Sequence, residues 1–260
     1  MNWNFKQWHR NRILRRVKLE ETLWRSAFRR CRFLRGLTDA ETAKLRDWVI
    51  LFLRDKQIYG AGGLELHDEM RVFIALQACV LILNLDLDYY KGWNEIIVYP
   101  AEFIPRHERT DEAGVVHVSD EPLAGESWLH GPVILSWDDV KDSGAEDGTN
   151  VVIHEFAHKI DMLNGGANGH PPLHRGMSRE AWTTAFSRAY REFCVEVEAG
   201  KNTALDPYAA EDPAEFFAVV SEAFFETPDA VLNRFPAVYE QLKQLYRQDP
   251  IDRFKQKILL

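Results

Sequence analysis

The chain has 260 residues, of which 46% are hydrophobic, 28% charged and 12% aromatic, and its net charge is −8. This apolar content is enough to build a packed core, so the composition excludes a mainly disordered chain. The 15 glycines and 11 prolines follow no repeating period, which excludes collagen-like and propeller-like arrays. The three cysteines are far apart and form no CxxC pair, so we expect a reducing, cytoplasmic location.

The sequence contains no candidate membrane span. Its most apolar run, residues 72–83, is flanked by Arg71 and Asp86 and is shorter than the roughly 18 apolar residues that a span needs. The run therefore predicts a buried helix. The first residues lack the continuous apolar core and the cleavage site of a secretory signal.

The N-terminal segment is strongly basic. Residues 1–35 carry a charge of +9, whereas the other 225 residues carry −17. Such a segment either contacts nucleic acid, an anionic membrane or an acidic partner, or it is a helix that docks on the acidic body. We favour docking, through Val17, Trp24, Phe28 and Leu34, because no nucleic-acid motif accompanies the charge and binding to nucleic acid is therefore not expected. Residues 1–36 are thus expected to form a basic arm or helix ahead of a single domain over residues 37–260.

The hydrophobic pattern of this domain predicts helices, then a small sheet, then helices. A helix begins after Thr38 or Asp39, and a second covers about residues 68–83. Strands are expected at 93–99, 115–118 and 132–137, joined by short loops, which indicates an antiparallel or mixed sheet. A helix begins at Val151 after a cap at Thr149 or Asn150, and further helices cover about 179–199, 213–226 and 236–247, the middle one starting at Pro213. This order indicates an α+β fold.

Chemistry is concentrated in the helix that starts at Val151, which contains the motif HExxH. His154 and His158 lie one turn apart on one helix face, where two imidazoles can share a tetrahedral zinc ion. Glu155 projects beside them, in position to accept a proton from a water that the metal activates. Asp161 lies on the same side and is either an acceptor for an imidazole N–H or an ordinary surface charge.

A zinc peptidase site needs a third protein ligand. The extended motif HExxHxxGxxH is excluded, because it requires glycine and histidine where this chain has Asp161 and Asn164. His170 and His174 lie in a polar, proline-rich loop, which positions a ligand less rigidly than a helix does.

The helix at 213–226 is the better source of the third ligand. It carries Glu215 and Glu222, seven residues apart on one face, with Glu211 just ahead of it. The spacing favours Glu215 or Glu222 over other residues but does not decide between them.

Longer strings of sequence add a resemblance to a known family. HEFAHKID, followed by DPYAAEDPAEFFAVVSEAFF, is similar to the Mlc titration factor A type of zinc peptidases. The similarity extends through LTDAE, WNEIIVYP, GPVILSW and RFPAVYEQLKQLYRQDP, and so covers most of the chain. The HEFxHxxD string also resembles the catalytic domain of lethal-factor-type toxin metallopeptidases.

The resemblance implies a gluzincin-like fold and assigns roles to residues at matching positions. It makes Glu215 the third ligand of one zinc ion per chain, beside His154 and His158. It places Tyr208, seven residues earlier, where its phenol faces the metal and supports the oxyanion of the transition state. It also implies a cytoplasmic, aminopeptidase-like enzyme that acts on peptides, with Glu155 as the base, and that binds and inactivates an Mlc-like repressor of a glucose system.

A second hypothesis belongs to another functional class. In it, the chain is a regulatory binding protein that titrates a transcription repressor, and its zinc is mainly structural. The basic arm or the exposed part of the helix at 236–247 would then form the docking surface.

Overall fold

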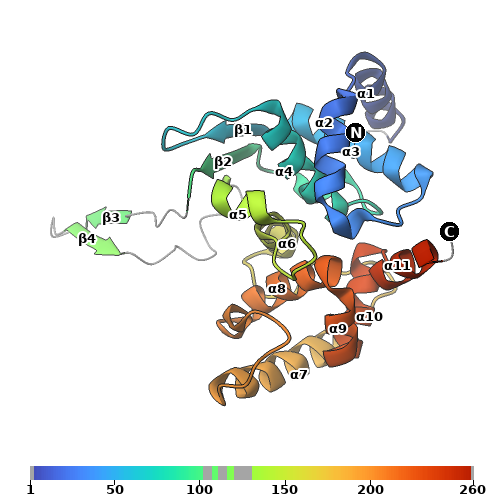
Figure 1. The fold of residues 1–260 in the computed structure, drawn as a ribbon. Helices are drawn as coiled ribbons and strands as arrows, with labels where there is room; N and C mark the ends of the chain where they lie inside the picture. Colours follow the sequence, from blue (N-terminus) through green and yellow to red (C-terminus); the bar gives the residue numbers. More distant parts are fainter. Residues whose placement is uncertain (1–2, 102–106, 111–115, 120–130, 259–260) are drawn as a thin grey trace.

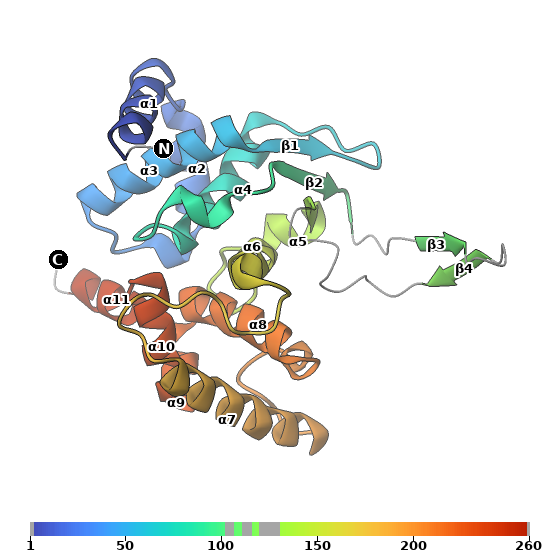
Figure 2. The same ribbon diagram turned by 180° about the vertical axis from the view of Figure 1, so that it is seen from behind.

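The computed structural model describes residues 3–101, 107–110, 116–119 and 131–258. Its N-terminal helices and a small sheet lie on one side of helix α6, and its C-terminal helices lie on the other (Figures 1 and 2). The α-helices of these residues are α1 (Trp3–Arg16), α2 (Glu21–Arg30), α3 (Asp39–Asp55), α4 (Asp68–Leu81), α5 (Trp137–Asp142), α6 (Val151–Asp161), α7 (Arg179–Glu198), α8 (Pro213–Glu226), α9 (Pro228–Arg234), α10 (Pro236–Tyr246) and α11 (Pro250–Ile258). Short 3-10 helices are η1 (Arg32–Leu34), η2 (Leu87–Tyr90), η3 (Met162–Asn164) and η4 (Pro207–Ala210). The α+β class is confirmed.

The main sheet has three parallel strands in the order β1 (Gln57–Gly60), β2 (Glu95–Tyr99) and β5 (Val133–Ser136). Ile58 is level with Ile96 in one pair, and Ile97 is level with Ile134 in the other. A separate antiparallel ribbon joins β3 (His107–Thr110) to β4 (Val116–Ser119).

The expected antiparallel or mixed pairing within one sheet is therefore wrong. Helix α4 connects β1 to β2 and carries the chain back to the same end of the sheet, which makes the two strands parallel. The strand expected at 115–118 corresponds to β4, apart from residue 115, which lies outside the described residues. This strand pairs with β3 in the ribbon and is not part of the main sheet. The third strand of the main sheet is β1, which was not predicted from the sequence.

The helix ends follow the capping residues of the sequence. Thr38 caps α3 in a reciprocal capping box with Glu41, and the Asn150 side chain accepts a hydrogen bond from Ile153 N at the start of α6. Asp212 caps α8, with Pro213 as its first residue. Helices α4 and α8 are buried along nearly their whole length, which makes them the centre of the core. No helix among the described residues is long and apolar enough to cross a membrane.

The basic N-terminal segment docks on the rest of the chain, as we expected for a helix on an acidic body. Trp24 and Leu34 are buried in the common core, and Phe28 packs against it. Val17 was expected to dock as well, but its side chain is exposed. Helix α1 is held instead by ion pairs, among them one from Arg10 to Asp86 at 2.7 Å. The boundary of the arm at residue 36 stays a prediction.

Candidate metal centre

Helix α6 presents the two histidines of the motif on the one side that is not fully buried. Val152, Phe156 and Ile160 are fully buried in the core and fix the rotation of the helix. His154 and His158 consequently project together toward α8, because residues four apart lie on the same face. The local pattern of apolar and polar residues in the sequence thus sets the direction of both imidazoles.

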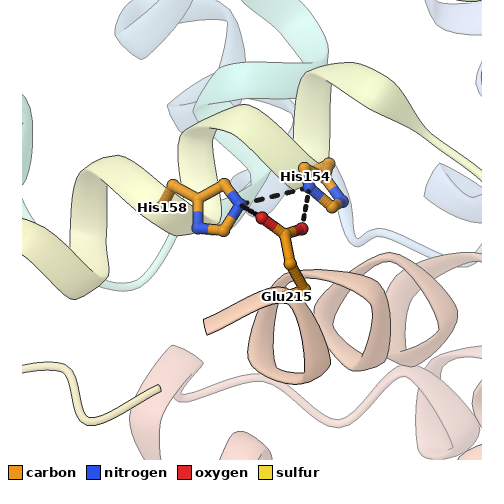
Figure 3. Close-up of side chains that lie close together, drawn as sticks. All are labelled: His154, His158 and Glu215. Atoms are coloured by element: carbon orange, nitrogen blue, oxygen red, sulfur yellow. Dashed lines mark hydrogen bonds and ion pairs between the residues drawn. The ribbon is translucent and has the colours of Figure 1, made fainter. Parts of the chain in front are cut away.

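Helix α8 brings a carboxylate to the same place. Asp212 accepts hydrogen bonds from the backbone N–H groups of Ala214 and Glu215, which fixes the first turn of α8. Glu215 lies in that turn and points at the two imidazoles (Figure 3). Its carboxylate oxygens lie 2.9 Å from His154 Nε2 and 3.4 Å from His158 Nε2.

The three side chains are close enough together that they could hold one cation. The Nε2 atoms of His154 and His158 are 3.1 Å apart, and one atom from each of the three side chains lies within 4.8 Å of the others. Two neutral imidazoles that face each other in this way present lone pairs to one another, which is unfavourable without a cation or a proton between them. Glu215 Oε2 is buried and faces His154 Nε2. Two imidazole nitrogens and a carboxylate oxygen are a donor set that suits zinc.

The electrostatics of the cluster agree with a site for a cation. Burial alone would lower the pKa of His154, but hydrogen bonds to Glu215 and Glu222 outweigh it and raise the pKa to about 10. Burial would raise the pKa of Glu215, yet the two histidines lower it to about 2. In the metal-free protein, a proton on His154 therefore occupies the position where a metal ion would bind.

Glu222 has a different role from Glu215. One of its oxygens lies 2.7 Å from His154 Nδ1, on the opposite edge of the ring from the cluster. The other accepts a hydrogen bond from the backbone N–H of Asn150. A carboxylate on Nδ1 fixes the ring orientation and leaves Nε2 free for a metal.

A buried polar network supports this arrangement beneath α6, and the sequence analysis missed it. The Asn150 side-chain amide donates to Glu226 at 2.7 Å and to Gln77 at 2.8 Å, in addition to its role as a cap. Glu226 also accepts from the backbone N–H of Glu146 at 2.8 Å. The sequence does contain a signal for this network. Helix α8 carries several acidic residues but is so apolar that it must be buried, and its carboxylates therefore need polar partners inside the protein.

Asp161 is buried rather than a surface charge. Its Oδ2 accepts hydrogen bonds from the backbone N–H groups of Asn168 and Gly169, at 2.7 and 2.6 Å, and so anchors the loop after α6. Its Oδ1 has no partner among the described residues, and the same is true of His158 Nδ1. These two atoms form no hydrogen bond with each other, so the role of Asp161 toward the imidazole stays a prediction.

Glu155 and Tyr208 lie beside the cluster. Glu155 follows His154 on α6, and no described residue forms a hydrogen bond or an ion pair with its carboxylate. The ring of Tyr208, in η4, lies 6.2 Å from that of His154 and is about half exposed. Burial and the charges of Glu215 and Glu211 raise the pKa of Tyr208 to about 12, so its phenol remains a hydrogen-bond donor at neutral pH.

The structure does not bring the two loop histidines to the cluster. His174 Nε2 bonds to the carbonyl oxygen of Leu245 at 2.7 Å, and the ring of His170 lies 6.2 Å from that of Trp182. A groove of about 800 Å³ between α7 and α10 is separate from the histidine–glutamate cluster, because none of the cluster residues line it.

Comparison with known proteins places this site in a family. Residues 5–247 match the family described as glucose-regulated metallo-peptidase M90, and the chain belongs to this family. The match includes most of the basic N-terminal segment. A metallopeptidase family implies a metal ion, and the histidine–glutamate cluster is the candidate for its site among the described residues.

The relatives have a more specific name. The chain is 38% identical to "Mlc titration factor A" of Escherichia coli (strain 55989 / EAEC), over 85% of this chain and 84% of that protein. It is 39% identical to the protein of the same name from Salmonella arizonae, over 85% of this chain and 88% of that protein. The resemblance noted from the motifs is confirmed.

Proposed function

We propose that this chain is a zinc-dependent peptidase in which His154, His158 and Glu215 hold one zinc ion. The observation that carries the proposal is the convergence of two imidazole nitrogens and a carboxylate oxygen within 4.8 Å of one another. When bound, zinc polarises a peptide carbonyl and lowers the pKa of water. The Glu222 carboxylate orients the His154 ring so that its Nε2 can bind the zinc ion.

Two residues of the chain carry the proton and charge steps. Glu155 takes the proton from the attacking water and delivers it to the leaving amine. Its carboxylate lies beside the cluster and is not paired with any residue that the structure describes, which leaves it available for this step. The Tyr208 phenol donates a hydrogen bond to the oxyanion that develops on the substrate carbonyl. The Tyr208→Phe variant is therefore expected to lower kcat more than it raises KM, which steady-state kinetics measures. A change in KM alone would contradict this role.

The substrate is proposed to be a peptide in extended conformation. Among the described residues, strand β5 lies at the edge of the main sheet and contacts α6. Its outer edge therefore offers backbone groups to an added strand. Aminopeptidase-like specificity is proposed from the family resemblance. A free substrate N-terminus would then be required.

Catalysis is tested by comparing zinc-loaded wild type with Glu155→Gln on a panel of chromogenic aminoacyl and N-blocked peptide substrates. We expect turnover that is lost in Glu155→Gln while bound zinc is unchanged. The matched control is Glu180→Gln, the same change at an exposed position of α7, which should keep full activity. Activity retained in Glu155→Gln would contradict the assignment of the base.

We also propose that the protein acts in the cytoplasm and binds an Mlc-like transcription repressor. The name of the relatives, Mlc titration factor A, supports this proposal. The alternative is that repressor binding is the main function and zinc is structural. These two alternatives are separated by adding the Glu155→Gln variant to a purified repressor and measuring whether the repressor is still bound. Titration that persists in this variant shows that binding is independent of catalysis, and loss of titration shows that the two are coupled.

A further inference from the structure

Helix α1 has a docked face and an outward face with different chemistry. Lys6 and Arg10 form ion pairs with Asp86, at 3.0 and 2.7 Å, and Arg10 also lies over the ring of Trp48. Ile13 and Leu14 lie on the same side and are half-buried. These contacts hold α1 against the rest of the molecule and fix which residues face solvent.

The outward face consists of the aromatic and basic residues at the remaining helical positions, all of which are exposed, and the polar pair Gln7 and Asn11 lies beside it. Its members are Phe5, Trp8, His9, Arg12, Arg15 and Arg16. More than half of the surface of Phe5 and of Trp8 is exposed, which is unusual for large aromatic side chains, since most of them are largely buried. Among the residues that the structure describes, none forms an ion pair with Arg12, Arg15 or Arg16. The face therefore combines unpaired positive charge with exposed aromatic surface.

The acidic residues near α1 do not cancel this charge. Asp86 and Asp88 are each paired with Lys6, and Lys91 also pairs with Asp88. Glu21, at the start of α2, is paired with Arg25 and Arg46. Helix α1 itself has no acidic residue. Its outward face is thus a positive surface on a chain whose remaining residues are strongly negative.

We propose that the outward face of α1 binds the surface of an anionic phospholipid bilayer. The arginines would contact lipid phosphates and carboxylates, and Phe5 and Trp8 would enter the boundary between headgroups and acyl chains. Helix α1 lies at the end of the molecule opposite α7, so α7 points away from the bilayer in this orientation (Figure 1).

The ring geometry favours a bilayer over nucleic acid. The rings of Phe5 and Trp8 stack on each other at 5.8 Å, and the Arg12 guanidinium lies over the Trp8 ring at 5.5 Å. Ring faces engaged in this way are less available to the bases of single strands, which bind by stacking on aromatic side chains. A pair of stacked rings still presents the apolar edges that a bilayer boundary accepts.

The test is sedimentation of the full chain with vesicles of phosphatidylcholine, alone or mixed with phosphatidylserine. We expect binding only to the mixed vesicles, and binding that weakens as salt is added. Replacing Arg12, Arg15 and Arg16 by Gln is expected to lower the partition coefficient roughly 100-fold, since each basic residue contributes about 1 kcal/mol near such a surface. Phe5→Ser with Trp8→Ser should weaken binding roughly tenfold while the salt dependence persists.

A matched variant controls for net charge. Arg175, Arg179 and Arg191 are also exposed, lie on or just ahead of α7, and lose the same charge when replaced by Gln. This variant should bind like wild type, and circular dichroism verifies that every variant is folded. The proposal is overturned if wild type ignores phosphatidylserine, if the control loses as much binding as the α1 variant, or if labelled DNA binds α1 and mixed vesicles do not.

Discussion

At the scale of single residues, two glutamates on one helix face have separate tasks. Glu215 approaches the Nε2 atoms of the histidines, whereas Glu222 approaches Nδ1 of His154 from the other side. They are two helical turns apart, so the sequence places both on one face of α8. It does not show which of the two approaches the Nε2 atoms of the histidines. That distinction depends on where α8 crosses α6, which is a property of the packed helices.

The role of Glu222 predicts a specific defect. In Glu222→Gln, the neutral side chain no longer stabilises a proton on His154 Nδ1, so the basicity of Nε2 falls. We expect zinc affinity to fall about 10- to 100-fold, as for other residues that orient a metal ligand. Competition with a chromophoric chelator measures it. The Glu192→Gln variant, on the surface of α7, should bind zinc normally, and unchanged affinity in Glu222→Gln would contradict the orienting role.

The raised pKa of His154 predicts that zinc binding releases a proton. With a pKa of about 10, His154 is protonated at pH 7 in the metal-free protein, and the metal must displace that proton. Apparent zinc affinity should therefore rise about tenfold for each pH unit between about 7 and 9. Calorimetry in buffers of different ionisation enthalpy should report about one proton released per zinc. Zero protons released at pH 7 would show that His154 is neutral before zinc binds.

At the scale of elements, the two caps at Thr38 and Asn150 provide a comparison. Thr38 is an exposed cap, and replacing it by Ala should cost about 1 kcal/mol of the free energy of unfolding. Asn150 is buried, and its loss also leaves Gln77 and Glu226 without their amide donor. Asn150→Ala is therefore expected to cost about 3 kcal/mol. Urea unfolding measures both variants, and equal costs would show that the buried network adds nothing to the cap.

Elements were predictable where local chemistry defines them. Proline, a capping acid and a long apolar run mark the start and extent of α8, and the asparagine cap with HExxH marks α6. Strand β1 has only four residues, three of them exposed, so it carries no hydrophobic alternation. Parallel pairing was missed because it depends on how α4 returns the chain to the sheet. The network around Asn150 joins α4, α6 and α8, and no single segment contains its signal.

At the scale of the whole molecule, the candidate metal centre links two parts of the fold. Helix α6 packs on the N-terminal helices and the sheet, whereas α8 packs on the C-terminal helices (Figure 2). The proposed ligands therefore connect helices separated along the chain by the whole of α7 and η4. A cation that binds only the folded arrangement stabilises this contact, because the unfolded chain does not keep the three side chains together.

Zinc is consequently expected to raise the melting temperature of the whole chain. At a free concentration about 1,000 times the Kd, it should add about 4 kcal/mol of stability, or roughly 10 °C in a chain of this size. Differential scanning fluorimetry of chelator-treated protein, with and without added zinc, measures the shift. His158→Ala should abolish it, whereas His9→Ala, at an exposed position of α1, should preserve it. A shift that survives in His158→Ala would place the stabilising zinc ion at another site.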